Sequence, residues 1–240
     1  MTYDISNKNT LVTGANRGIG KAIVESFLEH GASKVYAGVR TLGKAEALVV
    51  EFGEKVVPVE IDYDKPASIK AAAKTADDVQ VVVSNAGVLI GAGVMDEDVI
   101  EQFQTELNIN VYGLIRMAQA FAPVLKRNGG GAFVQINSIA SLSSFPRATY
   151  PASKAASYSF TQAIRHVFEE QGTAVLSVHP GPIATDMAAA SGLEDTDPPH
   201  VVSEGIVEAL REGNFHLFPD RMAKDFEKAY HNFAEGIIEA

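Results

Sequence analysis

The stretch T-G-A-N-R-G-I-G, from Thr13 to Gly20, begins at the end of a short strand expected over residues 9–13. Glycines at such a place allow a tight turn and a close backbone approach to a pyrophosphate, which the start of the following helix attracts. The spacing is G-x-x-x-G-x-G, and a glycine-rich turn can also be a purely structural link between strand and helix. Its place in the first strand–helix unit favours a dinucleotide-binding turn built on Gly14, Gly18 and Gly20.

Short β-branched runs alternate with longer helical patterns along the rest of the chain. Runs such as V-Q-V-V-V and A-V-L-S-V are nearly continuously apolar, which is typical of parallel strands buried on both faces. Strands are expected near residues 9–13, 34–39, 56–61, 79–84, 132–136, 174–179 and 215–218, and helices over 18–30, 44–52, 67–75, 98–127, 152–171, 201–211 and 222–238. This order predicts an α/β fold of the Rossmann type: a doubly wound parallel sheet of about seven strands with helices on both faces.

Size and composition suit one domain that spans residues 1–240. The 240 residues are 46% hydrophobic and carry a net charge of -10, which argues against nucleic acid or an anionic membrane as the main partner. The absence of cysteine excludes disulfides, thiolate metal sites and cysteine nucleophiles, and we expect no metal site. The N-terminus lacks the layout of a signal peptide, and the most apolar stretch, 79–95, is interrupted by Ser84, Asn85 and three glycines. We expect a soluble, cytoplasmic protein.

Charges near the glycine turn indicate which dinucleotide is favoured. The second expected strand ends at Val39 and is followed by Arg40, where an NAD-preferring site usually has Asp or Glu. Arg40 and Arg17 of the turn can pair with a 2′-phosphate, which a carboxylate would repel. These residues favour NADP; the alternative is that both arginines are ordinary solvated side chains.

Polar residues follow the third and fourth expected strands, at the edge where such sheets bind ligands. Asp62 can hold an adenine amino group, and Asn85, Ala86 and Gly87 can line the adenosine. Because Asn, Asp and Gly also form ordinary turns, either segment can be simple turn chemistry.

Tyr150 and Lys154 lie four residues apart in Y-P-A-S-K. Pro151 suits the first turn of a helix, so Tyr150 is expected at a helix start with Lys154 one turn on and on the same face. A free tyrosine has a pKa of about 10 and is a poor base at neutral pH. A close ammonium favours the phenolate, and lowering the pKa by roughly three units would take about 4 kcal/mol. Taken alone, the pair could be two ordinary surface residues; beside the nucleotide signals it predicts proton transfer.

Two further polar residues are candidates for the same chemistry. Ser138 follows the fifth expected strand, where its hydroxyl can donate to a substrate oxygen as charge develops. Asn110 lies within the long helix expected over 98–127, where asparagine is unfavourable, and can hold a water that links the lysine to solvent.

These motifs together resemble the short-chain dehydrogenase/reductase family over essentially the whole chain. The matching residues are Thr13 to Gly20, Asn85-Ala86-Gly87, Asn110, Ser138, Tyr150 to Lys154, and His179-Pro180-Gly181-Pro182-Ile183-Ala184-Thr185. The resemblance implies a catalytic tetrad of Asn110, Ser138, Tyr150 and Lys154. It also implies that Lys154 holds the nicotinamide ribose and that Ile183 and Thr185 contact the carboxamide.

The cofactor contacts expected from motif and resemblance together are Gly14, Asn16, Arg17, Gly18, Ile19, Gly20, Arg40, Asp62, Asn85, Ala86, Gly87, Tyr150, Lys154, Pro180, Gly181, Ile183 and Thr185. The serine–tyrosine separation is twelve residues, one fewer than usual in the family, so either the loop is shortened or Ser141 contributes in place of Ser138. Pro151 also replaces a small polar residue common after the tyrosine.

The function expected is that of an NADP-dependent carbonyl reductase or alcohol dehydrogenase. Its substrate would lie against Ser138, Tyr150, Phe145, Pro146 and Met187 and a lid at 188–199, within a substrate-binding loop near 186–200. These mostly apolar walls suit a ketone or aldehyde better than a highly charged compound. The alternatives are a catalytically silent NADP sensor or scaffold, which has no use for an acidic phenol, and an epimerase or dehydratase, which would need more than the about 60 residues that follow Gly181.

Apolar residues recur along two of the expected helices, at Leu114, Ala118 and Phe121 and at Ala156, Phe160 and Ile164. The pattern leaves room for a second buried face, and members of the family pair these helices, so a homodimer or homotetramer is expected. Core packing explains the same pattern equally well.

Overall fold

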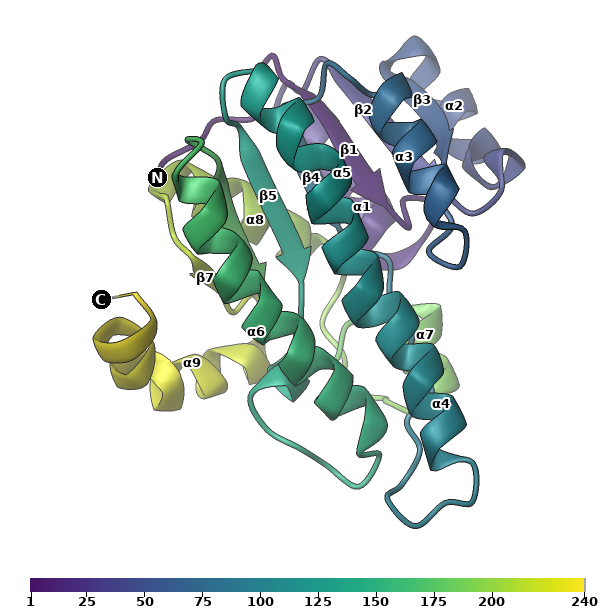
Figure 1. Cartoon of the computed structure of the whole chain (residues 1–240), viewed down its shortest axis with the longest axis vertical. Coiled ribbons are helices and arrows are strands. Elements are labelled where there is room, and N and C mark those ends of the chain that lie inside the picture. The colour runs from purple at the N-terminus through teal and green to yellow at the C-terminus, as the bar shows by residue number, and fades with distance from the viewer. Residues whose placement is uncertain (240) are drawn as a thin grey trace.

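One parallel sheet forms the centre of the computed structural model, which describes residues 1–239 (Figure 1). Its strands run in the order β3-β2-β1-β4-β5-β6-β7. Their bounds are β1 Asn9–Thr13, β2 Lys34–Val39, β3 Val56–Glu60, β4 Val81–Ser84, β5 Ala132–Ile136, β6 Ala174–Val178 and β7 His216–Leu217. The predicted doubly wound sheet is confirmed, with every expected strand present to within a few residues.

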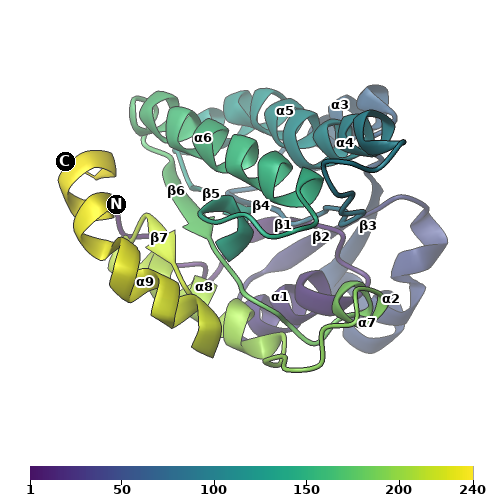
Figure 2. The same ribbon diagram turned by 90° about the horizontal axis from the view of Figure 1, so that it is seen from below.

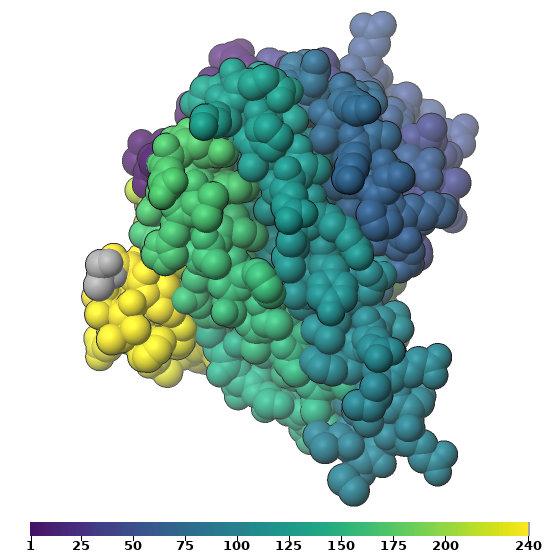
Figure 3. Space-filling view, viewed as in Figure 1, coloured from purple at the N-terminus to yellow at the C-terminus, as the bar shows by residue number. Residues whose placement is uncertain are grey.

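Helices cover both faces of this sheet. They are α1 Gly18–Glu29, α2 Glu46–Phe52, α3 Pro66–Thr75, α4 Val99–Glu106, α5 Gly113–Arg127, α6 Thr149–Glu169, α7 Asp186–Ala190, α8 His200–Glu212 and α9 Arg221–Phe233. Figure 2 shows α3, α5 and α6 on one face and α1, α2 and α8 on the other. The space-filling view shows α5 and α6 side by side over most of the first face (Figure 3).

Two hydrophobic cores lie on opposite faces of the sheet because successive strand residues point in opposite directions. Val12 and Val83 belong to the core under α1 and α8, whereas Leu11, Val82 and Phe133 belong to the core under α3 and α5. All five side chains are fully buried. Double-sided burial is therefore the reason that these strands read as unbroken apolar runs.

The single helix expected over 98–127 is interrupted. A π-helical turn, Leu107–Tyr112, separates α4 from α5, and such turns insert an extra residue into a helix and often occur at functional sites. Asn110 lies in this turn. Just beyond it, a Cβ at Gly113 would come within 2.2 Å of the Tyr63 ring, so the absence of a side chain lets α5 approach that ring.

The segment expected to be a lid is partly ordered into α7. The loop after α7 then runs back beside Ile183, which forms an isolated β-bridge with Asp197. Arg221, at the start of α9, forms ion pairs with Asp195 and Asp197 and ties this loop to the C-terminal helix. Within residues 1–239, no helix combines the length and apolar character needed to cross a membrane.

The strand order changes direction between β1 and β4. The chain moves outward from β1 through β2 to β3 and then returns to place β4 on the other side of β1. Loops that leave the carboxyl ends of β1 and β4 therefore diverge, and they leave a crevice where ligands bind in such sheets.

Candidate functional site

The glycine turn lies at the crevice between β1 and β4. Gly14 and Gly18 have φ angles of 65° and 53°, which disfavour other residues. A Cβ at Gly20 would lie 2.2 Å from the carbonyl oxygen of Gly14, so α1 starts in direct contact with the turn. This arrangement exposes backbone N–H groups at the start of a helix without side chains in the way, and such groups bind the phosphates of a pyrophosphate.

Thr13 joins the turn to the segment after β4. Its hydroxyl oxygen accepts hydrogen bonds from the backbone amides of Asn85, at 2.9 Å, and Ala86, at 3.0 Å. The side-chain amide of Asn85 in turn donates to the carbonyl oxygen of Thr13 at 2.8 Å. The two segments expected to bind a dinucleotide are thus held together by their own side chains.

The charged candidates for the cofactor lie around the same edge. Arg40 is exposed directly after β2. Arg17 is also exposed, and its guanidinium forms a 3.0 Å ion pair with Asp186 at the start of α7. Asp62 is largely buried; one oxygen accepts the amide of Asp64 at 3.1 Å, and the other lies 3.2 Å from the ammonium of Lys65.

Tyr150 and Lys154 occupy the first turns of α6, as expected. Both are buried, and the Lys154 ammonium lies 5.9 Å from the centre of the Tyr150 ring. The ammonium donates a 2.9 Å hydrogen bond to the carbonyl of Ile136, the last residue of β5. Burial lowers the pKa of Lys154 to about 8, while the negative charge of Glu106 acts to raise it.

The acidity of Tyr150 differs from the expectation. Burial raises the pKa of the phenol to about 12, and the charge of Glu106 raises it further, while a hydrogen bond with the Ser138 hydroxyl acts to lower it. Desolvation of the phenolate therefore outweighs the hydrogen bond from Ser138 in this environment. The surroundings of Tyr150 thus favour the neutral phenol over the phenolate.

Ser138 and Ser141 have different surroundings. The Ser138 hydroxyl accepts the amide of Ala140 at 3.1 Å and donates to the carbonyl of Pro180 at 3.3 Å, and it influences the phenol of Tyr150. The Ser141 hydroxyl contacts Nδ1 of His179 at 2.9 Å. Of the two, Ser138 is therefore the serine beside the tyrosine, despite the short separation in sequence.

The side chain of Asn110 is engaged by protein groups. Its oxygen accepts the amide of Val88 at 2.9 Å, and its nitrogen donates to the Val88 carbonyl at 3.0 Å and to Ser153 at 2.9 Å. The position of a Cβ at Gly87 would be 3.2 Å from this oxygen and 3.7 Å from the Lys154 ammonium. The side chains of Asn110 and Lys154 thus both lie close to Gly87.

The segment after β6 closes the site from the side of α1. Ile183 is buried, and the Thr185 hydroxyl accepts the amide of Ala188 at 3.3 Å and so caps α7. A Cβ at Gly18 would be only 3.0 Å from the Thr185 methyl group, so α7 lies against the glycine turn. The amide of Gly181 donates to the buried carboxylate of Asp220 at 2.7 Å. Pro180 and Gly181 are therefore anchored to the N-terminus of α9.

The residues expected to wall the substrate are less enclosed. Phe145 is 41% exposed and Met187 is 39% exposed. A cavity of about 680 Å³ lies between α1, α7 and α8 and is lined by Gly18, Thr185 and Leu193 among others. Phe145 and Tyr150 are not part of its lining, so it borders the glycine turn rather than the tyrosine.

Three buried residues with contacts to the site were not anticipated: Glu106, His179 in its contact with Ser141, and Asp220. Glu106 precedes Asn110 by four residues and so shares its helix face. That spacing was a usable signal, because a charged residue on the buried side of a helix is uncommon. The contacts of His179 and Asp220 join segments distant in sequence and had no local signature.

The comparisons with known proteins agree with this geometry. A family model described as "short chain dehydrogenase" matches residues 8–195. The "Short chain dehydrogenase pigC" of Monascus ruber is 31% identical over 230 residues, covering 87% of this chain and 76% of that protein. An uncharacterized oxidoreductase of Staphylococcus aureus strain USA300 is 29% identical over 216 residues, covering 87% of this chain and 93% of that protein.

Two solved structures are similar to the whole chain. The crystal structure of a short chain dehydrogenase from Burkholderia cenocepacia J2315 in complex with NADP has a TM-score of 0.88 and 32% identity, covering 98% of this chain and 97% of that one. A short chain dehydrogenase/reductase from Burkholderia phymatum in complex with NAD has a TM-score of 0.83 at 23% identity, covering 98% and 96%. At that identity the second structure supports the fold alone.

Proposed function

The chain belongs to the short-chain dehydrogenase family, and on this premise we propose that it is an NADP-dependent oxidoreductase acting on a ketone or aldehyde, or on the corresponding alcohol. The observation that carries the proposal is the closeness of Lys154, which pairs with Tyr150, to Gly87 in the segment proposed to line the nucleotide. A Cβ built at Gly87 would lie 3.7 Å from the Lys154 ammonium. Reduction of a carbonyl requires a proton donor close to the site that binds the dinucleotide.

The dinucleotide would be held by the glycine turn from Gly14 to Gly20, by Asp62 and 85–87, and by 180–185. The fit rests on the bare backbone of the turn, where a Cβ at Gly20 would overlap the Gly14 carbonyl. Arg40 and Arg17 support a preference for NADP, because guanidinium groups pair with a 2′-phosphate. The bound nicotinamide supplies or accepts the hydride.

The chain's own residues handle the proton. Tyr150, with a pKa of about 12, keeps its proton at neutral pH and is suited to donate it to a carbonyl oxygen as a general acid. Ser138, beside the phenol, would donate a second hydrogen bond to the same oxygen and so orient it. Lys154, with a pKa of about 8, stays mainly charged at neutral pH and favours the phenolate left behind.

Asn110 would act as a positioning residue in this scheme. Its side chain is occupied by Val88 and Ser153, so a relay water would have to bind elsewhere in the turn. A π-helical turn disturbs the regular pairing of backbone carbonyls, and a carbonyl of this turn is the group that we expect to hold the water.

The substrate is proposed to be an uncharged carbonyl compound, aromatic or aliphatic. Support comes from the partly exposed apolar side chains of Phe145, in the loop before α6, and Met187, in α7. A charged substrate would gain little from such walls.

A homodimer or homotetramer is also proposed. Leu114, Ala118 and Phe121 on α5 are core residues, so they do not support it. On α6, however, Phe160 is 44% exposed and Val167 is 62% exposed, seven residues apart on one face. Sedimentation of the purified protein would test the assembly, and a Phe160→Glu variant should shift it towards the monomer.

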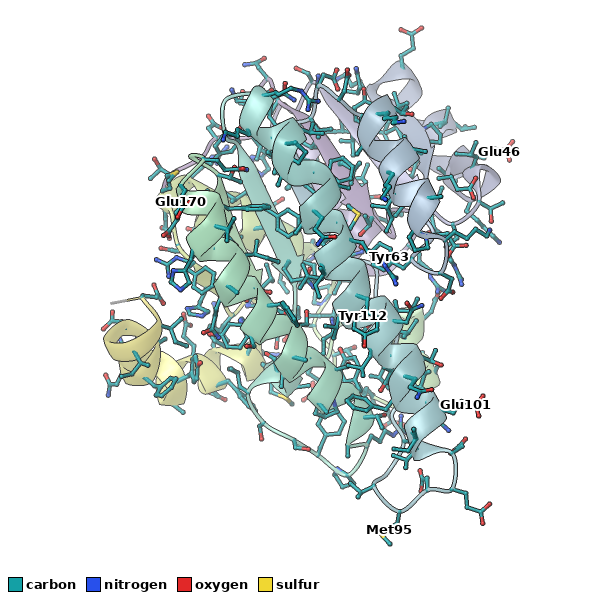
Figure 4. All side chains as sticks on the ribbon, viewed as in Figure 1. Glu46, Tyr63, Met95, Glu101, Tyr112 and Glu170 are labelled. Atoms are coloured by element: carbon teal, nitrogen blue, oxygen red, sulfur yellow. The ribbon has the colours of Figure 1, made fainter. Side chains whose placement is uncertain are left out.

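The function is tested by screening the purified protein with NADPH and NADH against aldehydes, aryl ketones, steroids and sugar ketones. We expect turnover with at least one uncharged carbonyl and a preference for NADPH. Tyr150→Phe should reduce kcat by about 10²–10⁴-fold, the usual contribution of a general acid, while NADPH binding is retained. Tyr112→Phe is the matched control, because Tyr112 lies exposed on the outer surface of the helix (Figure 4).

The outcomes separate the competing functions. Turnover by Tyr150→Phe within a few-fold of the wild type would contradict the proposed mechanism. Binding of NADPH with no turnover of any compound in the panel would instead support an NADP-sensing or scaffold protein on the same fold.

A further inference from the structure

Glu106, the last residue of α4, is completely buried next to the proposed proton-transfer site. Its Oε1 accepts hydrogen bonds from the backbone amides of Ile90, at 2.8 Å, and Gly91, at 3.1 Å. Its Oε2 is buried and has no hydrogen-bond partner within the described part of the chain. A buried carboxylate with one free oxygen is costly unless another charge balances it, so its position requires an explanation.

The two bonded amides belong to the loop that follows the nucleotide-lining segment. Asn110, one helical turn after Glu106, clamps the start of this loop at Val88 with two hydrogen bonds. Thr149, at the start of α6, accepts the amide of Ala92 at 3.0 Å. The loop 88–92 is therefore fixed along its whole length, and Glu106 supplies its central attachment.

The charge of Glu106 reaches the two residues that handle the proton. It acts to raise the pKa of both Lys154 and Tyr150, and for Lys154 it is the influence that opposes burial. A buried ammonium loses its proton readily when no anion lies near it. The charge of Glu106 thus offsets part of the effect of burial on the Lys154 ammonium.

We propose, resting on the oxidoreductase function above, that Glu106 is a positioning residue of the proton-transfer site. Its one oxygen holds the loop 88–92 beside Asn110, and its negative charge keeps the Lys154 ammonium protonated at neutral pH.

Other charged and titratable groups face the same region and must be separated from Glu106. They are Tyr150 and Lys154 on α6, Arg147 in the loop before α6, and His179 after β6. The Arg147 side chain packs against Gly91. The charge of Lys154 acts to lower the pKa of His179. Of these groups, Glu106 is the only carboxylate. Its replacement therefore removes the one carboxylate of this set without altering the cations.

Glu106→Gln tests the charge alone, because a glutamine oxygen can still accept the amides of Ile90 and Gly91. Titration of Lys154 can be followed in the whole protein by NMR of ¹³Cε-labelled lysines, with Lys154→Arg identifying its signal. We expect Glu106→Gln to lower the pKa of Lys154 by roughly one unit, because a nearby opposite charge is lost. The alkaline limb of the pH profile of kcat/KM, where Lys154 loses its proton, should move to lower pH in the same way.

Glu101→Gln is the matched control, since Glu101 lies on the same helix and points away from the protein (Figure 4). It should change neither the titration nor the profile. Glu106→Ala removes charge and loop attachment together and should also lower Tm. An unchanged Lys154 titration in a folded Glu106→Gln protein would overturn the proposal. Because the NMR titration needs no turnover, it remains decisive even if the screen of carbonyl compounds finds no substrate.

Discussion

Arg17 in the glycine turn and Asp186 at the start of α7 form an ion pair of 3.0 Å, although 169 residues separate them. The pair joins the segment that would bind the pyrophosphate to the segment proposed to cover it. It also occupies the guanidinium that the 2′-phosphate of NADP would need. Binding of a 2′-phosphate by Arg17, as proposed above, would therefore compete with this contact.

Asp186→Asn should tighten the binding of NADPH without changing that of NADH. Both partners are largely exposed, and such pairs contribute less than about 1 kcal/mol, so we expect a decrease in the NADPH Kd of no more than about fivefold. Fluorescence titration with each nucleotide at low and high salt measures it, and the gain should shrink with salt. An equal gain for NADH would show that Arg17 does not bind the 2′-phosphate.

Ser138 and Ser141 should differ in what they contribute. Ser138→Ala is expected to reduce kcat by about 10²-fold, the effect of losing one donor to a developing oxyanion. Ser141→Ala should leave kcat within a few-fold but lower Tm, because its hydroxyl is bonded to the buried His179. Steady-state kinetics and thermal unfolding of both variants distinguish the roles. The reverse pattern would assign substrate orientation to Ser141.

His179 should make the protein sensitive to acid. It is fully buried between Ser141 and Ser177, and burial lowers its pKa to about 3. The unfolded chain, with its ordinary histidine pKa of about 6.5, binds this proton at a higher pH than the native state. Stability is therefore expected to fall as pH drops from about 6.5 towards 3, by up to about 1.4 kcal/mol per pH unit.

Urea unfolding of the wild type and His179→Gln at pH 7 and pH 5 measures that effect. The variant should lose part of the difference between the two pH values, even if it is less stable at both. His166→Gln, at an exposed position on α6, is the control and should keep the full difference. Equal pH dependence in wild type and His179→Gln would exclude His179 as the cause.

Asp220 should be important for stability. Its two oxygens accept the amides of Gly181, at 2.7 Å, and Ala223, at 3.0 Å, so it caps α9 and anchors the segment after β6. Asp220→Ala removes a helix cap and leaves the Gly181 amide unpaired, and we expect a loss of about 2 kcal/mol or more. Denaturant unfolding tests this, with Asp225→Ala as the control, because Asp225 forms only an exposed pair with Lys228. Similar losses in both variants would contradict the anchoring role.

The elements of this fold follow closely from local sequence. The strands, the glycine turn and the place of Tyr150 in the first turn of α6 are all predicted from sequence, because apolar runs, glycine and proline act on the backbone at their own positions. The alternation of strand and helix predicted a doubly wound parallel sheet, whereas the order of its strands came from the structure. The π-helical turn at Leu107–Tyr112 was not predicted, because the helical pattern of the sequence continues through it. In the structure, Asn110 of this turn bonds to Val88 and Ser153, which are distant in sequence.

What only the tertiary structure decided is the electrostatic character of the site. The Y-P-A-S-K spacing placed the Tyr150 phenol near the Lys154 ammonium, but the balance between desolvation and attraction depends on what encloses both groups. Burial by distant segments raises the pKa of Tyr150, lowers that of Lys154 and brings the carboxylate of Glu106 within range of both. Local sequence determines on which helix or strand a polar group lies. Its pKa depends on how far remote parts of the chain exclude water from it, because desolvation disfavours the charged form.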